Sequence, residues 1–263
     1  MENLNLKCLF LNKKLFFLSF SLFVSSSLYS VSNNELIIEI RKKIQYLKDS
    51  PVGAIDSEGK YTLDSDNGLN CSGFIKWLAD GFYMPLRRQK GEVPLYMSIQ
   101  ALRIKHPNSR GDRYTNLFEE HRDPYFGLDW TRNIAVLLAT LRNNQSYDIE
   151  DFDVRDSEIV SYIEDRGYPI EDIEKVIINQ AKKNTNQLFL CSISGPFGEN
   201  PRLHQHYHVC AFIPYYDMED ELKIAVFERN KETSFDYLKS RYPETYCHLV
   251  WISIEGDFEL IVP

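Results

Sequence analysis

The hydrophobic pattern of the chain changes at Gln187, and this change restricts the fold more than any other feature. Before it, apolar residues recur at helical spacing; after it, they form short runs separated by turns, as in β-strands. The segments predicted as helices cover residues 34–48, 71–80, 95–104, 129–142, 156–165, 170–183 and 234–240. The predicted strands cover residues 188–194, 206–216, 222–228, 246–254 and 258–262. Mostly helices followed by mostly antiparallel strands predict an α+β fold.

Residues 1–30 are unlike the rest of the chain. Three lysines precede an apolar run over residues 15–24, and a serine-rich stretch ends at Ser30. This order predicts a secretory signal peptide and export to the periplasm or cell envelope. The apolar run is too short for an ordinary membrane span, so we expect no stable span after cleavage. An uncleaved N-terminal anchor is the alternative interpretation.

The remaining residues, 31–263, suit a single domain of ordinary composition. The full chain is 43% hydrophobic and 26% charged, with a formal net charge of −8. An acidic chain repels nucleic acid and anionic membrane surfaces, so we expect neither as a partner. The sequence calls for no cofactor and no bound metal.

Four cysteines follow the predicted signal peptide: Cys71, Cys191, Cys210 and Cys247. An exported chain can form disulfides, but no pair has CxxC spacing and the four are widely separated. We expect at most one disulfide, and we expect Cys71 to remain outside it.

Cys71 is placed where a polar loop ends and an amphipathic helix begins. The stretch Asn70-Cys71-Ser72-Gly73-Phe74 follows a glycine-containing loop, and Gly81 is the predicted end of the helix. In the first turn, unpaired N–H groups and the helix dipole favour thiolate over thiol. The sequence therefore marks Cys71 as a candidate nucleophile. The alternative is a small buried cysteine without chemistry.

Three histidines alternate at the start of one predicted strand: His204, His206 and His208. Residues at i and i+2 in a strand share a face, so a general base can be held there beside a cleft. If the next strand pairs antiparallel, its last residues return beside the histidines, and Glu228 can orient an imidazole. The alternative is a polar strand edge in which Glu228 is a surface residue.

These motifs resemble those of the NlpC-type papain-like cell-wall endopeptidases. The stretch Asn70–Phe74 is similar to the family's Asp-Cys-Ser-Gly-Phe, and His208–Phe212 is similar to its His-Val-Gly-Ile-Tyr. The resemblance covers residues 50–82 and 185–263 approximately. It implies a papain-like core in which the nucleophile helix packs on an antiparallel sheet. Residues from about 83 to 185 would then form a large, mostly helical insertion.

The resemblance also implies a cysteine peptidase or amidase. It assigns Cys71 as the nucleophile, His208 as the general base and Glu228 as the residue that orients the base. It implies hydrolysis of an amide bond, with the stem peptides of peptidoglycan as the substrate. Further residues matched to the site by the resemblance or by spacing are Tyr61, His206 and Asn70, the last of which replaces the family's aspartate.

The predicted insertion contains one candidate binding motif. Aromatic residues and Arg132 surround the start of the helix predicted from Asp129, with Trp130 between them. Such a helix start can bind a sugar or a carboxylate. A capped helix with an aromatic staple is the structural alternative.

Two other functions remain open from the sequence. The residues His204, His206, His208 and Glu228 offer imidazole and carboxylate ligands for zinc, although this leaves the Cys71 motif without a role. A non-catalytic cell-envelope binding module on the same fold is the other alternative, since Asn70 and the long insertion depart from the family pattern.

Overall fold

The computed structural model describes residues 31–51, 53–63, 68–93, 95–106, 123–196 and 204–261. The predicted signal peptide, residues 1–30, lies outside the described residues. The helices are α1 (Asn33–Ile44), α2 (Cys71–Gln89), α3 (Ile99–Leu102), α4 (Phe126–Asn143), α5 (Ile173–Lys183) and α6 (Phe235–Arg241). The strands are β1 (Tyr168–Pro169), β2 (Gln187–Pro196), β3 (His204–Tyr216), β4 (Leu222–Glu228), β5 (Lys231–Thr233) and β6 (Tyr246–Ser253).

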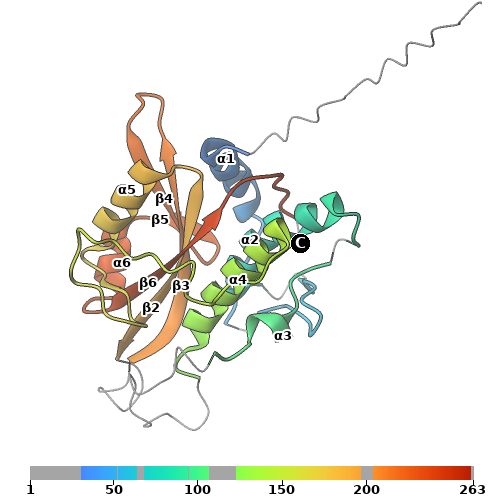
Figure 1. Ribbon diagram of the computed structural model, residues 1–263, viewed down its shortest axis with the longest axis horizontal. Coiled ribbons are helices and arrows are strands. Elements are labelled where there is room, and N and C mark those ends of the chain that lie inside the picture. The colour runs from blue at the N-terminus through green and yellow to red at the C-terminus, as the bar shows by residue number, and fades with distance from the viewer. Residues whose placement is uncertain are drawn as a thin grey trace, which may run out of the picture.

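The strands form one six-stranded sheet in the order β1-β6-β2-β3-β4-β5, and every neighbouring pair is antiparallel. The long strands β2, β3 and β6 lie at its centre, as Figure 1 shows. The α+β class predicted from the sequence is therefore confirmed. No helix in the described residues combines the length and apolarity needed to cross a bilayer.

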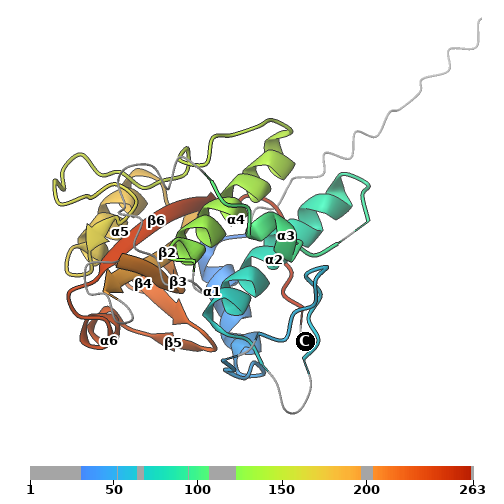
Figure 2. The ribbon, with the colours of Figure 1, turned by 90° about the horizontal axis from the view of Figure 1, so that it is seen from below.

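Helices cover both faces of the sheet (Figure 2). We call the face under α1, α2 and α4 the α2 face, and the opposite face, under α5 and α6, the α6 face. Alternate strand residues contribute to each. The α2 face buries strand residues that pack with α1, α2 and α4, including Leu190, Val209, Ala211, Phe227 and Val250. The α6 face buries Phe189, Cys191, Cys210, Phe212 and Leu249, among others. The period of two along each strand thus sorts side chains into two separate cores.

Helix α2 begins where the sequence predicts but ends later. The side chain of Asn70 accepts a hydrogen bond from the backbone N–H of Gly73 at 2.8 Å, which caps the helix. The predicted stop at Gly81 is wrong, because the helix continues to Gln89. Gly81 instead allows a close approach: a Cβ there would lie 2.5 Å from the ring of Phe258. The backbone of Glu259 also donates to the Gly81 carbonyl at 2.9 Å.

Three other predicted elements differ from the structure. The predicted helix over 156–165 is a series of turns, in which Asp165 has a left-handed φ of 58°. The helix predicted over 95–104 shortens to α3. The described part of the predicted strand 258–262 is not a strand, because this tail packs along α2, where Trp77 donates to the carbonyl of Ile261 at 2.8 Å.

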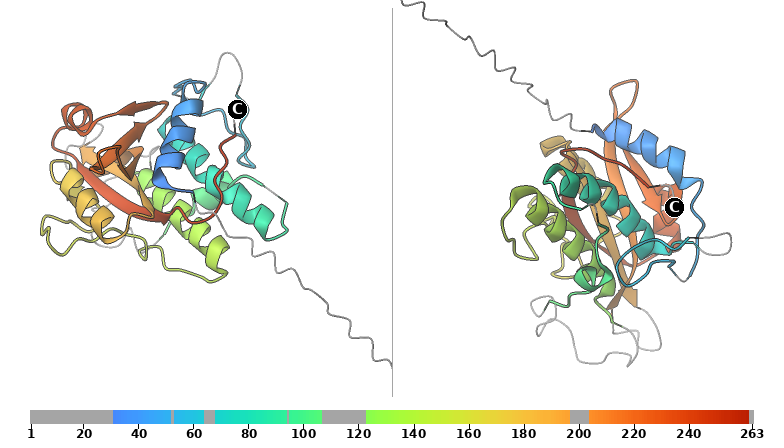
Figure 3. Two further views of the ribbon diagram at one scale, coloured as in Figure 1. Left: turned by 90° about the horizontal axis from the view of Figure 1, so that it is seen from above. Right: turned by 90° about the vertical axis from the view of Figure 1, so that its right-hand side faces the viewer.

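Helix α4 lies within the predicted insertion but packs directly on the main sheet. Its buried residues Trp130, Ile134, Ala135 and Leu138 join the core of the α2 face. Helices α2 and α4 lie side by side over the sheet in both views of Figure 3. The described part of residues 83–185 therefore contributes to the same core as α2.

Candidate functional site

The Cys71 side chain lies at the start of α2, beside the end of β4. The backbone N–H groups of Val209 and Ser72 and the guanidinium of Arg229 lie near its thiol and favour the thiolate. The register explains why Val209 is available: the paired residues of β3 and β4 run only from Ala211 to Tyr216. Cys71 packs with the core of the α2 face and is half-buried.

Burial dominates the acidity of this thiol. Removal from water raises the pKa of Cys71, while the N–H of Val209, the charge of Arg229 and the N–H of Ser72 act in the opposite direction. The net shift is upward, whereas the helix start alone predicts a lowered pKa. The expected thiolate is therefore not favoured in this state, because desolvation outweighs the helix dipole and the nearby cation.

His208 and Glu228 lie together, as the antiparallel pairing predicts. The His208 Nε2 is 3.4 Å from Glu228 Oε1, and both side chains are buried. The imidazole stacks on the ring of Tyr242 with centroids 4.9 Å apart, and Tyr242 donates its hydroxyl to Glu228 at 2.9 Å. From the end of β4, Glu228 therefore binds the Tyr242 hydroxyl and lies close to the imidazole of His208 without a hydrogen bond to it.

The electrostatics keep His208 neutral. Burial lowers the pKa of His208 to about 3, with the charges of Arg229 and Arg241 adding to this effect. Glu228 is the group that would raise it, but that carboxylate also lies 3.9 Å from Arg229 and 3.8 Å from Arg241. Its negative charge is thus already compensated.

The structure does not bring the nucleophile and the base into contact. Cys71 packs with the core of the α2 face, whereas His208 stacks on Tyr242, which belongs to the core of the α6 face. No hydrogen bond joins the thiol and the imidazole in the described part of the chain. The link between them is indirect: the thiol lies near the backbone N–H of Val209, the residue that follows His208.

The three histidines of β3 go to different partners. His206 Nδ1 is 2.9 Å from the Ser192 hydroxyl, and His204 meets the ring of Tyr246 edge-on at 5.8 Å. A bulge between Ile193 and Ser194 breaks the simple alternation, so the spacing of the histidines does not place them on one face. The predicted zinc cluster of His204, His206, His208 and Glu228 is therefore not assembled in this structure.

Tyr61, which the resemblance matched to a tyrosine near the thiol, precedes α2 in the chain and contacts the helix at Asp80. Its hydroxyl donates to Asp80 at 2.7 Å, and Asp80 forms a buried ion pair with Lys76 at 2.5 Å. Lys76 also donates to the carbonyl of Gly59 at 2.6 Å. This network fastens the loop before α2 to the helix, so the structure gives Tyr61 a positioning contact rather than a contact with the thiol.

Trp130 and Arg132 are both turned inward. Trp130 donates its indole N–H to the carbonyl of Ser72 at 3.1 Å and so joins α4 to the start of α2. Arg132 is fully buried and binds Asp153 through two hydrogen bonds of 2.9 and 2.6 Å, and Asp165 at 3.2 Å. The predicted sugar or carboxylate site is therefore occupied by carboxylates of the chain itself.

The Arg132 network includes one residue that sequence reasoning missed. His248 Nε2 lies 3.3 Å from Asp153, on β6. Burial works against ionisation, but His248 and Arg132 outweigh it and lower the pKa of Asp153 to about 2. Spacing cannot reveal this pairing, because Arg132, Asp153 and His248 come from three distant segments. Spacing cannot reveal the contact between Tyr242 and Glu228 either. Arg229, in contrast, directly follows Glu228 in the sequence.

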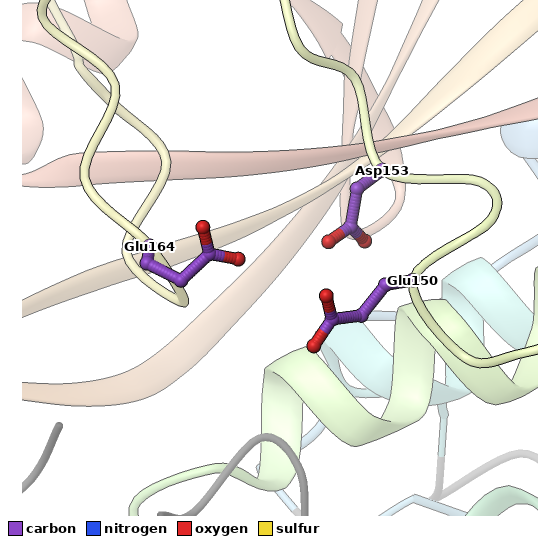
Figure 4. Close-up of side chains that lie close together, drawn as sticks. All are labelled: Glu150, Asp153 and Glu164. Atoms are coloured by element: carbon purple, nitrogen blue, oxygen red, sulfur yellow. The ribbon is translucent and has the colours of Figure 1, made fainter. Parts of the chain in front are cut away.

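One group of three carboxylates is close enough together to bind a cation. The oxygens of Glu150, Asp153 and Glu164 lie within 4.8 Å of one another and point toward a common space (Figure 4). Arg155 already lies among them, 3.2 Å from Glu150 and 2.6 Å from Glu164. With Arg132 also bound to Asp153, the negative charge of the group is met by two guanidinium groups.

A groove of about 710 Å³ opens beside the start of α2. Its lining includes Asn70 and Ser72 from the helix start, Trp130 from α4, and Arg103. This volume is within the range of ligand sites. It places a concave surface next to the turn that carries Cys71.

Comparisons with known proteins do not add an identity to this geometry. No family model matches the chain, and neither a curated protein nor a solved structure matches it significantly.

Proposed function

We propose that the protein is an exported cysteine hydrolase of papain-like architecture that cleaves an amide bond, with Cys71 as the nucleophile. One observation carries the proposal: the N–H of Val209 lies near the Cys71 thiol and favours its thiolate, and the preceding residue, His208, lies 3.4 Å from Glu228. A thiol on one face of the sheet thus lies near an imidazole and a carboxylate on the other, where the start of α2 packs beside β3 and the end of β4. Nucleophile, base and orienting group are the three parts that thiol catalysis needs.

The surroundings of Cys71 support acyl transfer. The thiol sits at a helix start, where backbone N–H groups can stabilise an oxyanion. Arg229 supplies a positive charge next to the developing thiolate. The order of elements, a nucleophile helix followed by a sheet whose strands carry the imidazole and the carboxylate, supports the papain-like interpretation.

The protonation states define the reaction path. Burial raises the pKa of Cys71 and lowers that of His208, so the resting pair is neutral thiol and neutral imidazole. His208 would then act as a general base, taking the thiol proton as sulfur attacks the carbonyl carbon. The amine leaves with that proton, and water hydrolyses the thioester. Because His208 and Cys71 lie on opposite faces of the sheet, the imidazole must leave Tyr242 and the start of β3 must rearrange before the ring can reach the thiol.

The substrate we propose is an amide of peptidoglycan stem peptides. The signal-like residues 1–30 and the motif resemblance support it, and the groove beside Asn70 and Ser72 offers room for an extended peptide.

The test is release of soluble fragments from purified peptidoglycan, followed by mass spectrometry. We expect Cys71→Ala to abolish release and His208→Ala to reduce it about a hundredfold or more. His204→Ala is the matched control, because its ring lies on the same strand but contacts Tyr246. Circular dichroism checks that each variant is folded. Full activity of a folded Cys71→Ala protein would overturn the proposal.

One observation favours a second function, a non-catalytic cell-envelope binding module. The His208 ring is stacked on Tyr242, and its Nε2 makes no hydrogen bond in the described residues. A ring held in this way leaves the thiol without a base. Cosedimentation with peptidoglycan, unchanged by Cys71→Ala and without fragment release, would support this function over hydrolysis.

A further inference from the structure

Three cysteines that the proposed chemistry does not use lie together on the α6 face of the sheet. Cys191, Cys210 and Cys247 come from β2, β3 and β6, and each is 0% exposed. All three belong to the core of the α6 face, whereas Cys71 packs with the core of the α2 face. The sheet thus separates the candidate nucleophile from the other three thiols.

The strand register distinguishes the pairs. Cys191 is directly opposite Cys210 in the β2–β3 pairing. In the β2–β6 pairing, Cys191 is opposite Leu249, and Cys247 is opposite Ile193. Directly opposite residues in an antiparallel pair have Cα atoms about 4.5–5.5 Å apart, whereas diagonal neighbours are about 7–8 Å apart. A disulfide needs Cα atoms about 4.4–6.8 Å apart, so only the direct pair fits without backbone movement.

We propose that Cys191 and Cys210 form an intrachain disulfide when the protein folds in an oxidising compartment, and that Cys247 remains a free thiol beside it. The bridge would join β2 to β3, the strand that carries His208. It is independent of the proposed hydrolase function, because it needs neither Cys71 nor the histidine.

The chemistry is thiol–disulfide exchange with a small disulfide such as oxidised glutathione. One protein thiolate attacks a sulfur of the reagent and releases one glutathione thiol, leaving a mixed disulfide. The second protein thiolate then attacks the protein sulfur and releases the second glutathione thiol. Two protein thiols and one reagent disulfide thus become one protein disulfide and two reagent thiols.

Burial determines when this reaction takes place. Burial raises the pKa of Cys191 well above its usual value, and hydrogen bonds with Cys210 and Cys247 add to the shift. A buried neutral thiol is a poor nucleophile. We therefore expect oxidation during folding, before β2 and β3 are covered by α5 and α6, and slow oxidation of the folded reduced protein.

The experiment refolds the reduced full chain in a glutathione redox buffer, blocks free thiols with N-ethylmaleimide, and maps peptic peptides by mass spectrometry. We expect a cross-linked peptide pair containing Cys191 and Cys210, with Cys8, Cys71 and Cys247 alkylated. The folded reduced protein in the same buffer should form the bridge at least ten times more slowly. A bridge from Cys191 or Cys210 to Cys247, or alkylation of all five cysteines after refolding, would overturn the proposal.

Variants provide a second readout that does not depend on peptide mapping. Oxidised wild type and Cys247→Ser should unfold about 5–10 °C higher than their reduced forms. Cys210→Ser should show no such difference. If Cys210→Ser does not fold, the comparison of oxidised and reduced Cys247→Ser still decides the question, and an absent shift there contradicts the proposal.

Discussion

The Nε2 of His208 lies 3.4 Å from the Oε1 of Glu228, yet the imidazole faces Tyr242 and not the thiol of Cys71. His208 and Glu228 are therefore close together on one face of the sheet, whereas Cys71 packs on the other, near the N–H of Val209. The stack on Tyr242 and the burial of the ring hold His208 in its neutral form. Because the folded protein holds this histidine neutral, its free energy of unfolding should depend on pH.

Replacing His208 by phenylalanine should weaken the pH dependence of stability. The pKa of His208 is about 3 in the folded state and its ordinary value is 6.5, so the unfolded chain binds a proton over this range and the folded chain does not. Stability therefore rises with pH in this window and is lost as pH falls below 6.5. Between pH 6.5 and 5, wild type should lose about 1.5 kcal/mol more than His208→Phe in urea unfolding. Equal losses would contradict the assignment.

Breaking the buried Arg132 network should be strongly destabilising. Arg132→Leu leaves Asp153 and Asp165 in the core without their cation, which should cost about 3–5 kcal/mol. Arg155→Leu is the matched control: its guanidinium also contacts Asp153, at 3.9 Å, but is half exposed. That change should cost less than about 1 kcal/mol. Chemical denaturation of both variants measures the difference, and equal costs would show that burial does not govern the network.

A methyl group at Gly127 should push α4 away from the sheet. A Cβ at this position would lie 2.7 Å from the Ser192 hydroxyl and 2.8 Å from the His206 carbonyl. Gly127→Ala should therefore destabilise by about 1–3 kcal/mol, in thermal or chemical unfolding. Gly91→Asn is the control, since nothing lies within 4 Å of a Cβ there and asparagine tolerates its φ of 72°. If both variants unfold alike, α4 does not pack as closely as described.

The fold class and most strands were predictable because local pattern determines them. The alternation that ends β4 at Glu228 and the cap at Asn70 depend on residues close in sequence. Helix ends and face assignments were not predictable in the same way. Helix α2 continues past Gly81, and this glycine makes room for Phe258, which packs against it from the far end of the chain.

The candidate site shows the same limit. Spacing placed His204, His206 and His208 on one face, but a bulge in the β2–β3 pairing directs His206 to Ser192 and His208 to Tyr242. The carboxylates that bind Arg132 lie in loops whose positions only the tertiary fold determines. Pairing of Glu228 with His208 was predictable, because it follows from the antiparallel return of the next strand.

The stability of the protein should depend on the residue that caps α2 and on its charge. Asn70→Ala removes the acceptor for the Gly73 N–H and for the Ser72 hydroxyl, and should cost about 1 kcal/mol. Asn70→Asp keeps the acceptor and adds a negative charge at the positive end of the helix, which should stabilise by about 0.3–1 kcal/mol. Urea unfolding at pH 7 measures both. A destabilised Asn70→Asp protein would mean that repulsion elsewhere outweighs the helix dipole.

Arg229 should control the reactivity of Cys71. Burial raises the pKa of this thiol and the charge of Arg229 lowers it, so Arg229→Gln should raise the pKa further. Alkylation by iodoacetamide at pH 8 should therefore slow roughly threefold, because only the thiolate reacts. The profile of rate against pH should move to higher pH. Arg241→Gln is the matched control: Arg241 contacts Glu228 and Tyr242 and acts on His208, so the Cys71 profile should remain in place. A profile that moves with Arg241→Gln and not with Arg229→Gln would place the thiol nearer to His208 and Tyr242 than to Arg229.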